Sequence, residues 1–186
     1  MKKYYPILVA KAGELSALSH LSPDVQNMTS PIIQVISGSQ ARLINFGCDF
    51  WNFDGNELYL DFSLVQDDEA SVESFIITLV EHNVNVVPVI QDIATLRYIR
   101  LFGRLLKDDM INEVAVRFSN SGYFDRINPI NEVLIDHLSI AKENISIIID
   151  FRYIHRNNYD SVESKILETL PSIDSVTFPI CRTVPS

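Results

Sequence analysis

Residues 57–90, ELYLDFSLVQDDEASVESFIITLVEHNVNVVPVI, contain the pattern on which the expected fold depends. Apolar, β-branched runs of strand length stand at 57–62 and 84–90, and the segment between them has a helical period. One helix face would hold Val72, Phe75, Ile76, Leu79 and Val80, which fall at i, i+3, i+4, i+7 and i+8. Ser71 precedes this stripe and is typical of a helix N-cap. The stretch therefore predicts a strand, a helix and a second strand.

Further strand-length runs lie on both sides of this unit, at 4–10, 31–36, 113–118, 145–151 and 175–180. Most of these runs are apolar at successive positions, as expected of parallel strands that are covered on both faces. Amphipathic segments separate them. The alternation predicts an α/β fold of about seven parallel strands joined by right-handed crossovers.

An internal repeat bears on how such a sheet is closed. Residues 59–79 resemble residues 148–170: Asp61-Phe62 matches Asp150-Phe151, and SVES recurs at 71–74 and 161–164. Repeated units with the same strand-end residue favour a (β/α) TIM-barrel-like fold over the alternative, an open doubly wound sheet. Barrels ordinarily have eight strands. We therefore expect either an incomplete barrel, an overlooked strand, or a barrel that a partner chain closes.

Composition limits the class of protein. The 186 residues include 47% hydrophobic and 21% charged residues, which excludes a disordered chain and fits a single domain over 1–186. The formal net charge is −9, from 15 basic and 24 acidic residues, so binding of nucleic acid through bulk charge is not expected. No segment approaches the ~18 apolar residues of a membrane span. These features predict a cytoplasmic protein.

No cofactor motif is present. The two cysteines, Cys48 and Cys181, are too few for a disulfide framework or a cysteine-rich zinc site. With six glycines, the chain has neither the dinucleotide fingerprint nor the phosphate-binding loop of nucleotide-binding proteins. We therefore expect no cofactor and no metal.

Charged residues gather at the expected carboxyl ends of the strands, where barrels place their functional groups. They are Lys11, Glu14, Asp61, Arg117, Asp150 and Arg152. One hypothesis is an anion-binding pocket, in which Lys11, Glu14, Arg117 and Arg152 bind the ligand while Asp61 and Asp150 do acid–base work. The alternative is an ion-pair network that fills the barrel mouth, because buried charges must be paired.

The start of the chain resembles a known family. Residues 5–18, YPILVAKAGELSAL, and 30–35, SPIIQV, are similar to the first two strands of the "beta protein" family of phages, prophages and bacterial mobile elements. Asp61, Pro88, Arg117, Asp150 and Pro179 fall where later strands of that family carry similar residues. The resemblance implies a barrel-like α/β fold and a link to phage exclusion or antiviral defence. Family members are longer, so the last barrel elements are expected to be missing here.

Two functions follow as hypotheses. The first is a phage-interference protein that recognises a phage or host protein or a small anion. The second is a TIM-barrel hydrolase or lyase that acts on a phosphate-bearing small molecule or nucleotide. An open sheet edge also predicts a homo-oligomer, because unpaired strand edges associate.

Overall fold

A seven-stranded, all-parallel sheet is the centre of the fold. The computed structural model describes residues 4–53, 56–65, 68–91, 98–118, 141–150 and 180–181. The strands are β1 Ile7–Val9, β2 Ile32–Gln34, β3 Glu57–Asp61, β4 Asn85–Gln91, β5 Val114–Phe118, β6 Ile145–Asp150 and β7 Ile180–Cys181. The helices are α1 Ala12–Ser19, α2 Pro23–Asn27, α3 Gln40–Phe50, α4 Glu69–Glu81 and α5 Ile99–Lys107, with a 3-10 turn at Lys142–Asn144. The predicted parallel α/β class is confirmed.

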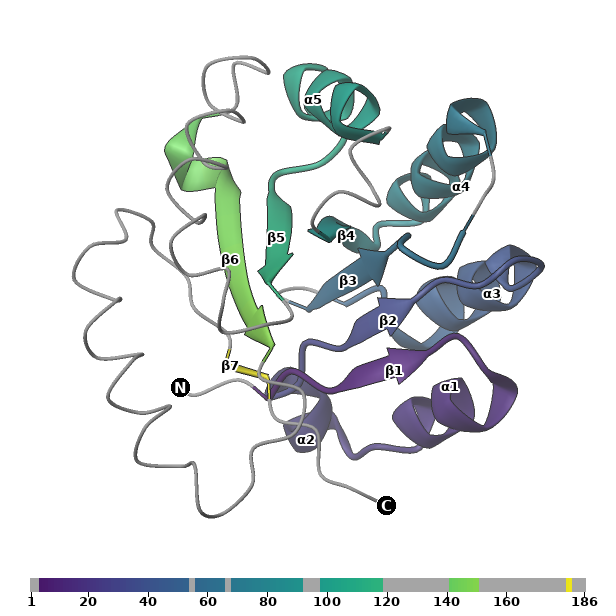
Figure 1. Ribbon diagram of the computed structural model, residues 1–186. Helices are drawn as coiled ribbons and strands as arrows, with labels where there is room; N and C mark the ends of the chain where they lie inside the picture. Colours follow the sequence, from purple (N-terminus) through teal and green to yellow (C-terminus); the bar gives the residue numbers. More distant parts are fainter. Residues whose placement is uncertain are drawn as a thin grey trace.

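The strands lie in the sheet in the same order as in the chain, from β1 to β7. Helices α1, α3, α4 and α5 lie along the outer side of the curved sheet (Figure 1). A doubly wound sheet reverses its strand order at a switch point and carries helices on both faces. Within the described ranges the sheet has no such reversal, so its order is that of a singly wound βα repeat.

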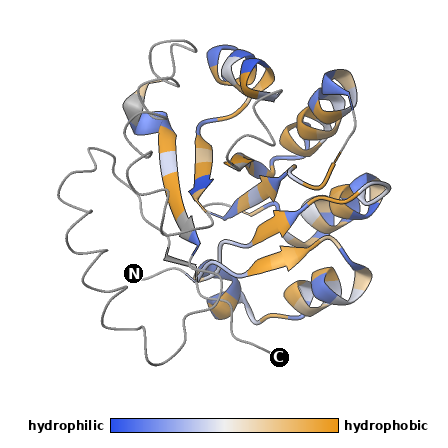
Figure 2. Ribbon diagram, viewed as in Figure 1, coloured by the Kyte–Doolittle hydropathy of each residue, from blue (hydrophilic) through white to orange (hydrophobic). Residues whose placement is uncertain are grey.

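Two hydrophobic clusters lie on opposite faces of the sheet. The larger joins outward-facing strand residues, such as Leu58 and Leu60, to the buried residues of the helices, such as Ile76 and Leu79. Figure 2 shows the consequence: the helices carry both hydrophilic and hydrophobic residues, whereas β1 and β2 are predominantly hydrophobic. The smaller cluster lies on the inner face of the sheet and includes Tyr59.

The inner face is layered along the strand direction. Its apolar middle consists of Ile32, Tyr59, Val87, Val89, Ala115 and Ile148. Polar side chains lie on the same face at both ends of this apolar middle, each two residues from one of its members. Towards the amino ends of the strands they are Glu57, Glu113 and Ser146, and towards the carboxyl ends they are Asp61, Arg117 and Asp150. The period of two along each strand produces this arrangement.

The helix between β3 and β4 follows the predicted stripe, because Val72, Phe75, Ile76 and Leu79 are buried. The predicted N-cap at Ser71 is wrong. Asp68 is the N-cap, and its carboxylate accepts a hydrogen bond from the Ser71 backbone N–H at 2.8 Å. Both residue types cap helices, and the extended backbone before Glu69 places Asp68 at the cap.

Several sequence-based expectations fall on residues outside the described ranges. They include Arg152, the second copy of the repeat beyond Asp150, and Pro179. Among the described residues, no helix combines the length and the apolar character that crossing a bilayer requires.

Candidate functional site

Three charged side chains from separate strands meet on the inner face of the sheet. Asp61 ends β3, Asp150 ends β6, and Arg117 is the penultimate residue of β5. They do not share one row of the sheet: Asp61 is paired with Val89, which is paired with Ala115, two residues before Arg117. In a sheet of tilted strands, residues that are staggered in register can lie at the same height. The three side chains therefore meet at the carboxyl ends of their strands.

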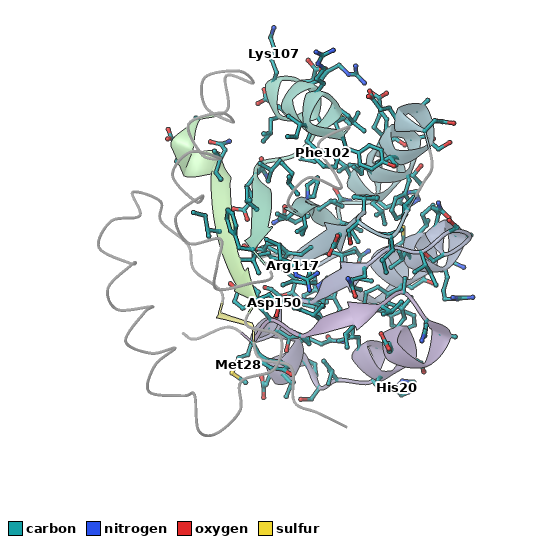
Figure 3. The ribbon with its side chains drawn as sticks, in the orientation of Figure 1. His20, Met28, Phe102, Lys107, Arg117 and Asp150 are labelled. Carbon is teal, nitrogen blue, oxygen red and sulfur yellow. The ribbon has the colours of Figure 1, made fainter. Side chains whose placement is uncertain are left out.

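Arg117 is hydrogen-bonded to both aspartates. Its Nη1 donates to Asp61 Oδ2 at 2.6 Å, while Nη2 and Nε donate to Asp150 Oδ2 at 2.5 Å and 3.2 Å. The residues are nearly sealed from solvent, with exposed fractions of 5% for Arg117, 0% for Asp61 and 2% for Asp150. Figure 3 shows Arg117 beside Asp150 at the ends of their strands. We call these three residues the Arg117 cluster.

The cluster leaves part of the arginine unused. A guanidinium has five N–H donors, and the hydrogen bonds to the aspartates engage one on each nitrogen. Nη1 and Nη2 therefore each retain a second N–H that no acceptor among the described residues takes. Asp61 has less capacity left, because its Oδ1 accepts the Ser63 backbone N–H at 2.9 Å while its Oδ2 accepts from Arg117.

The residues at the end of β1 have separate environments. Lys11 is exposed and forms the N-cap of α1. The Glu14 carboxylate accepts a hydrogen bond from the Val9 backbone N–H, which gives Glu14 a structural partner on β1. Arg42, which the sequence analysis missed, reaches from α3 and donates from Nη1 to the Ala10 carbonyl at 3.2 Å. The expected ligand-binding set is thus only partly brought together, and Arg152 lies outside the described residues.

A second polar group occupies the amino end of the inner face. The Tyr59 hydroxyl donates to Glu113 Oε1 at 3.2 Å, and Ser146 donates to the same oxygen at 3.0 Å. Burial, together with the charges of Glu113 and Glu57, raises the pKa of Tyr59 above its usual range. This group was not predicted from the sequence, because the charged residues singled out there all lie at the carboxyl ends of the strands. Alternation within ELYLD and EVAVRF was the available signal.

Metal ligation has no support from the described residues, since among them no three or more His, Cys, Asp or Glu side chains gather in a way that could hold an ion. Asp61 and Asp150 have Arg117 between them, and its positive charge opposes a cation there. His155, the histidine nearest the expected mouth in sequence, lies outside the described ranges.

The comparisons with known proteins bear on the family. A family model described as Beta protein matches residues 4–178, which is nearly the whole chain. The searches of curated proteins and of solved structures gave no match.

Proposed function

The chain belongs to the beta protein family, and we propose that it acts in phage exclusion by binding a small anionic ligand at the carboxyl ends of its strands. The observation that carries this proposal is Arg117, which two aspartates hold in place while Nη1 and Nη2 each keep an N–H donor. A fixed guanidinium fork suits the oxygens of phosphate or carboxylate. The proposed setting is the cytoplasm of a bacterium that carries a phage-derived or other mobile element.

The sum of charges at the carboxyl ends of the strands favours anion binding more than the Arg117 cluster alone would. The Arg117 cluster carries one positive and two negative groups. Lys11 and Arg42 add two cations near the end of β1, and Glu14 adds one carboxylate. The six charges cancel, so an incoming anion would not meet a net negative edge. Lys11 is exposed, which leaves its ammonium available for a ligand.

We further propose that the sheet closes into a barrel. The strand order follows the chain without reversal, and the helices that Figure 1 labels α1, α3, α4 and α5 lie on its outer side. The inner face has a polar, an apolar and a second polar layer, as side chains fill the interior of small barrels in layers. Closure would surround the Arg117 cluster with strand ends and give the ligand one mouth.

The competing function is a hydrolase or lyase in which Asp61 and Asp150 transfer protons. The Oδ2 atoms of both aspartates accept hydrogen bonds from Arg117, so a substrate that transfers a proton there must compete with the guanidinium. This competition favours binding over turnover. A ligand found in the test below would be examined for conversion by the wild-type protein.

The test measures binding of inorganic phosphate by calorimetry to the wild type and to two matched variants. Lys11→Ala removes the exposed cation at the proposed site and should weaken binding about tenfold, or ~1.4 kcal/mol. Lys107→Ala makes the same change on α5, away from Arg117 in Figure 3, and should leave the affinity unchanged. Equal weakening by both variants would mean general charge attraction, and no binding by the wild type would refute the anion site.

Phage exclusion by the chain is tested separately, by plating phage on cells that produce it. Cells that produce the wild-type chain should reduce the plating efficiency of at least one phage in a panel, whereas cells that produce Lys11→Ala should plate it like cells with an empty vector. Full exclusion by Lys11→Ala would separate phage exclusion from the anion site. A phage or host protein would then be the favoured partner.

A further inference from the structure

Two residues with neutral polar side chains, Gln34 and Ser63, lie next to Asp61. Gln34 on β2 is paired in register with Asp61 on β3, so the two residues lie side by side on the inner face. Gln34 is half-buried, and its side-chain amide makes no hydrogen bond within the described part of the chain. Ser63 follows β3 two residues after Asp61, and its hydroxyl oxygen is buried without a hydrogen-bond partner in the described ranges.

Asp61 is the hydrogen-bond partner of neither side chain in the observed geometry. Its Oδ1 accepts the Ser63 backbone N–H, and its Oδ2 accepts from Arg117. The first of these bonds also holds the Ser63 backbone over the carboxylate, which keeps the serine close to the Arg117 cluster. A buried hydroxyl without a partner is unfavourable. A group that enters from outside the chain would relieve it.

We propose that Gln34 and Ser63 are specificity residues that recognise the hydroxyl groups of a phosphate ester of a sugar or polyol. This inference rests on the proposed anion site: Lys11 and the remaining N–H donors of Arg117 take the phosphate, while the amide and the hydroxyl take the alcohol groups. An amide and a hydroxyl each donate and accept, as alcohols do. Sites built to hydrogen-bond a hydroxyl discriminate strongly against analogues that lack it.

The experiment compares ribose 5-phosphate with methyl phosphate, which has the same charged group but no hydroxyl. Calorimetry on the wild type should give a dissociation constant at least about tenfold lower for ribose 5-phosphate. Gln34→Leu and Ser63→Ala should each remove most of that preference and leave methyl phosphate binding within about twofold. Matched controls are Gln26→Leu on α2 and Ser74→Ala on the exposed face of α4, which should keep the preference. Thermal unfolding checks that each variant folds.

Three results would count against the inference, and they are distinguishable from one another. Equal affinity of the wild type for both esters would overturn it while the anion site stands. Equal loss of both ligands in Gln34→Leu and Ser63→Ala would show a general disturbance of the site and would overturn it as well. Failure of the wild type to bind either ester would overturn both this inference and the proposed anion site.

Discussion

The guanidinium of Arg117 lies among groups that have lost almost all contact with water, because Asp61 and Asp150 are 0% and 2% exposed. Removing charges from water is costly, and only close pairing with good geometry offsets that cost. Arg117 meets this condition with one aspartate at each end of its planar group. The cluster therefore holds β3, β5 and β6 together at their carboxyl ends, whether or not a ligand binds there.

Removing the Arg117 side chain should show how strongly the fold depends on this cluster. Arg117→Met would leave two buried carboxylates without their cation, and the free energy of unfolding should fall by about 3–5 kcal/mol. The triple variant Arg117→Met, Asp61→Asn, Asp150→Asn removes all three charges and should recover part of the loss. Urea unfolding at pH 7 measures both. A loss below about 1 kcal/mol in Arg117→Met would match an exposed ion pair and contradict the buried cluster.

The environment of Tyr59 predicts how the stability of the chain changes at alkaline pH. Burial, then the charges of Glu113 and Glu57, raises its pKa in the folded chain, so the folded state keeps the hydroxyl proton at pH values where the unfolded state, with a tyrosine pKa of about 10, loses it. Its contribution to stability is complete below pH ~10 and is lost as the pH rises further.

Tyr59→Phe should therefore be less stable than the wild type at pH 8 by about 1.5–3 kcal/mol, the value of a hydrogen bond to a charged group. The difference should shrink above pH ~10. Denaturant unfolding of both proteins between pH 8 and 11 gives the comparison. A stability difference that stays constant across this range would show that folding does not favour the protonated form of the Tyr59 side chain.

At the scale of the elements, the regular period decided what could be predicted. The run at 84–90 became β4, Asn85–Gln91, and the stripe from Val72 to Leu79 became the buried face of α4. The cap of α4 could not be assigned from sequence, because Asp68 and Ser71 are both good cap residues and only the backbone selects between them. Local competition of this kind is invisible to periodicity.

The site was predictable to a similar extent. Asp61, Arg117 and Asp150 were identified as strand-end charges, and they do converge. Gln34 and Ser63 were missed because a neutral side chain gives no sequence signal until the strand register places it beside a charge. The role of Glu14 depends on a hydrogen bond to Val9 that the sequence does not show.

The contact of α3 with α4 and with Val84, the residue before β4, depends on the absence of a side chain at Gly47. A Cβ there would lie 2.7 Å from Leu79 Cδ2 and 3.3 Å from Val84 Cγ2. Overpacking by Gly47→Ala should cost about 1–3 kcal/mol, and alanine returns ~1 kcal/mol through its higher helix propensity. The net loss of stability should therefore be up to about 2 kcal/mol. Gly13→Ala on α1 is the matched control, because a Cβ there has no neighbour within 4 Å. It should stabilise the chain, and a loss of equal size in both variants would contradict the packing argument. Thermal and urea unfolding measure both.

At the scale of the whole molecule, the edge at β1 determines whether the sheet is open. The Ala10 N–H donates to the Gln34 carbonyl on β2 at 3.0 Å, so the neighbouring N–H of Val9 points away from β2. Glu14 accepts that N–H, and its carboxylate thus occupies the place of a neighbouring strand at this end of β1. A negative charge at a strand edge also discourages pairing with another chain. By alternation, the N–H of Ile7 points to the same side.

Amide hydrogen exchange at Ile7 therefore tests closure of the barrel. If the chain itself closes the sheet, the Ile7 amide is hydrogen-bonded and should exchange nearly as slowly as that of Leu8, which faces β2, and the rate should not depend on protein concentration. If two copies pair through this edge, as the expected homo-oligomer requires, protection of Ile7 should fall on dilution while that of Leu8 persists. Fast exchange at Ile7 at every concentration would mean an open edge and would refute closure. The Val9 amide is the internal reference, because Glu14 protects it from exchange in all three cases. In Glu14→Ala the Val9 amide should exchange quickly unless another strand lies alongside β1.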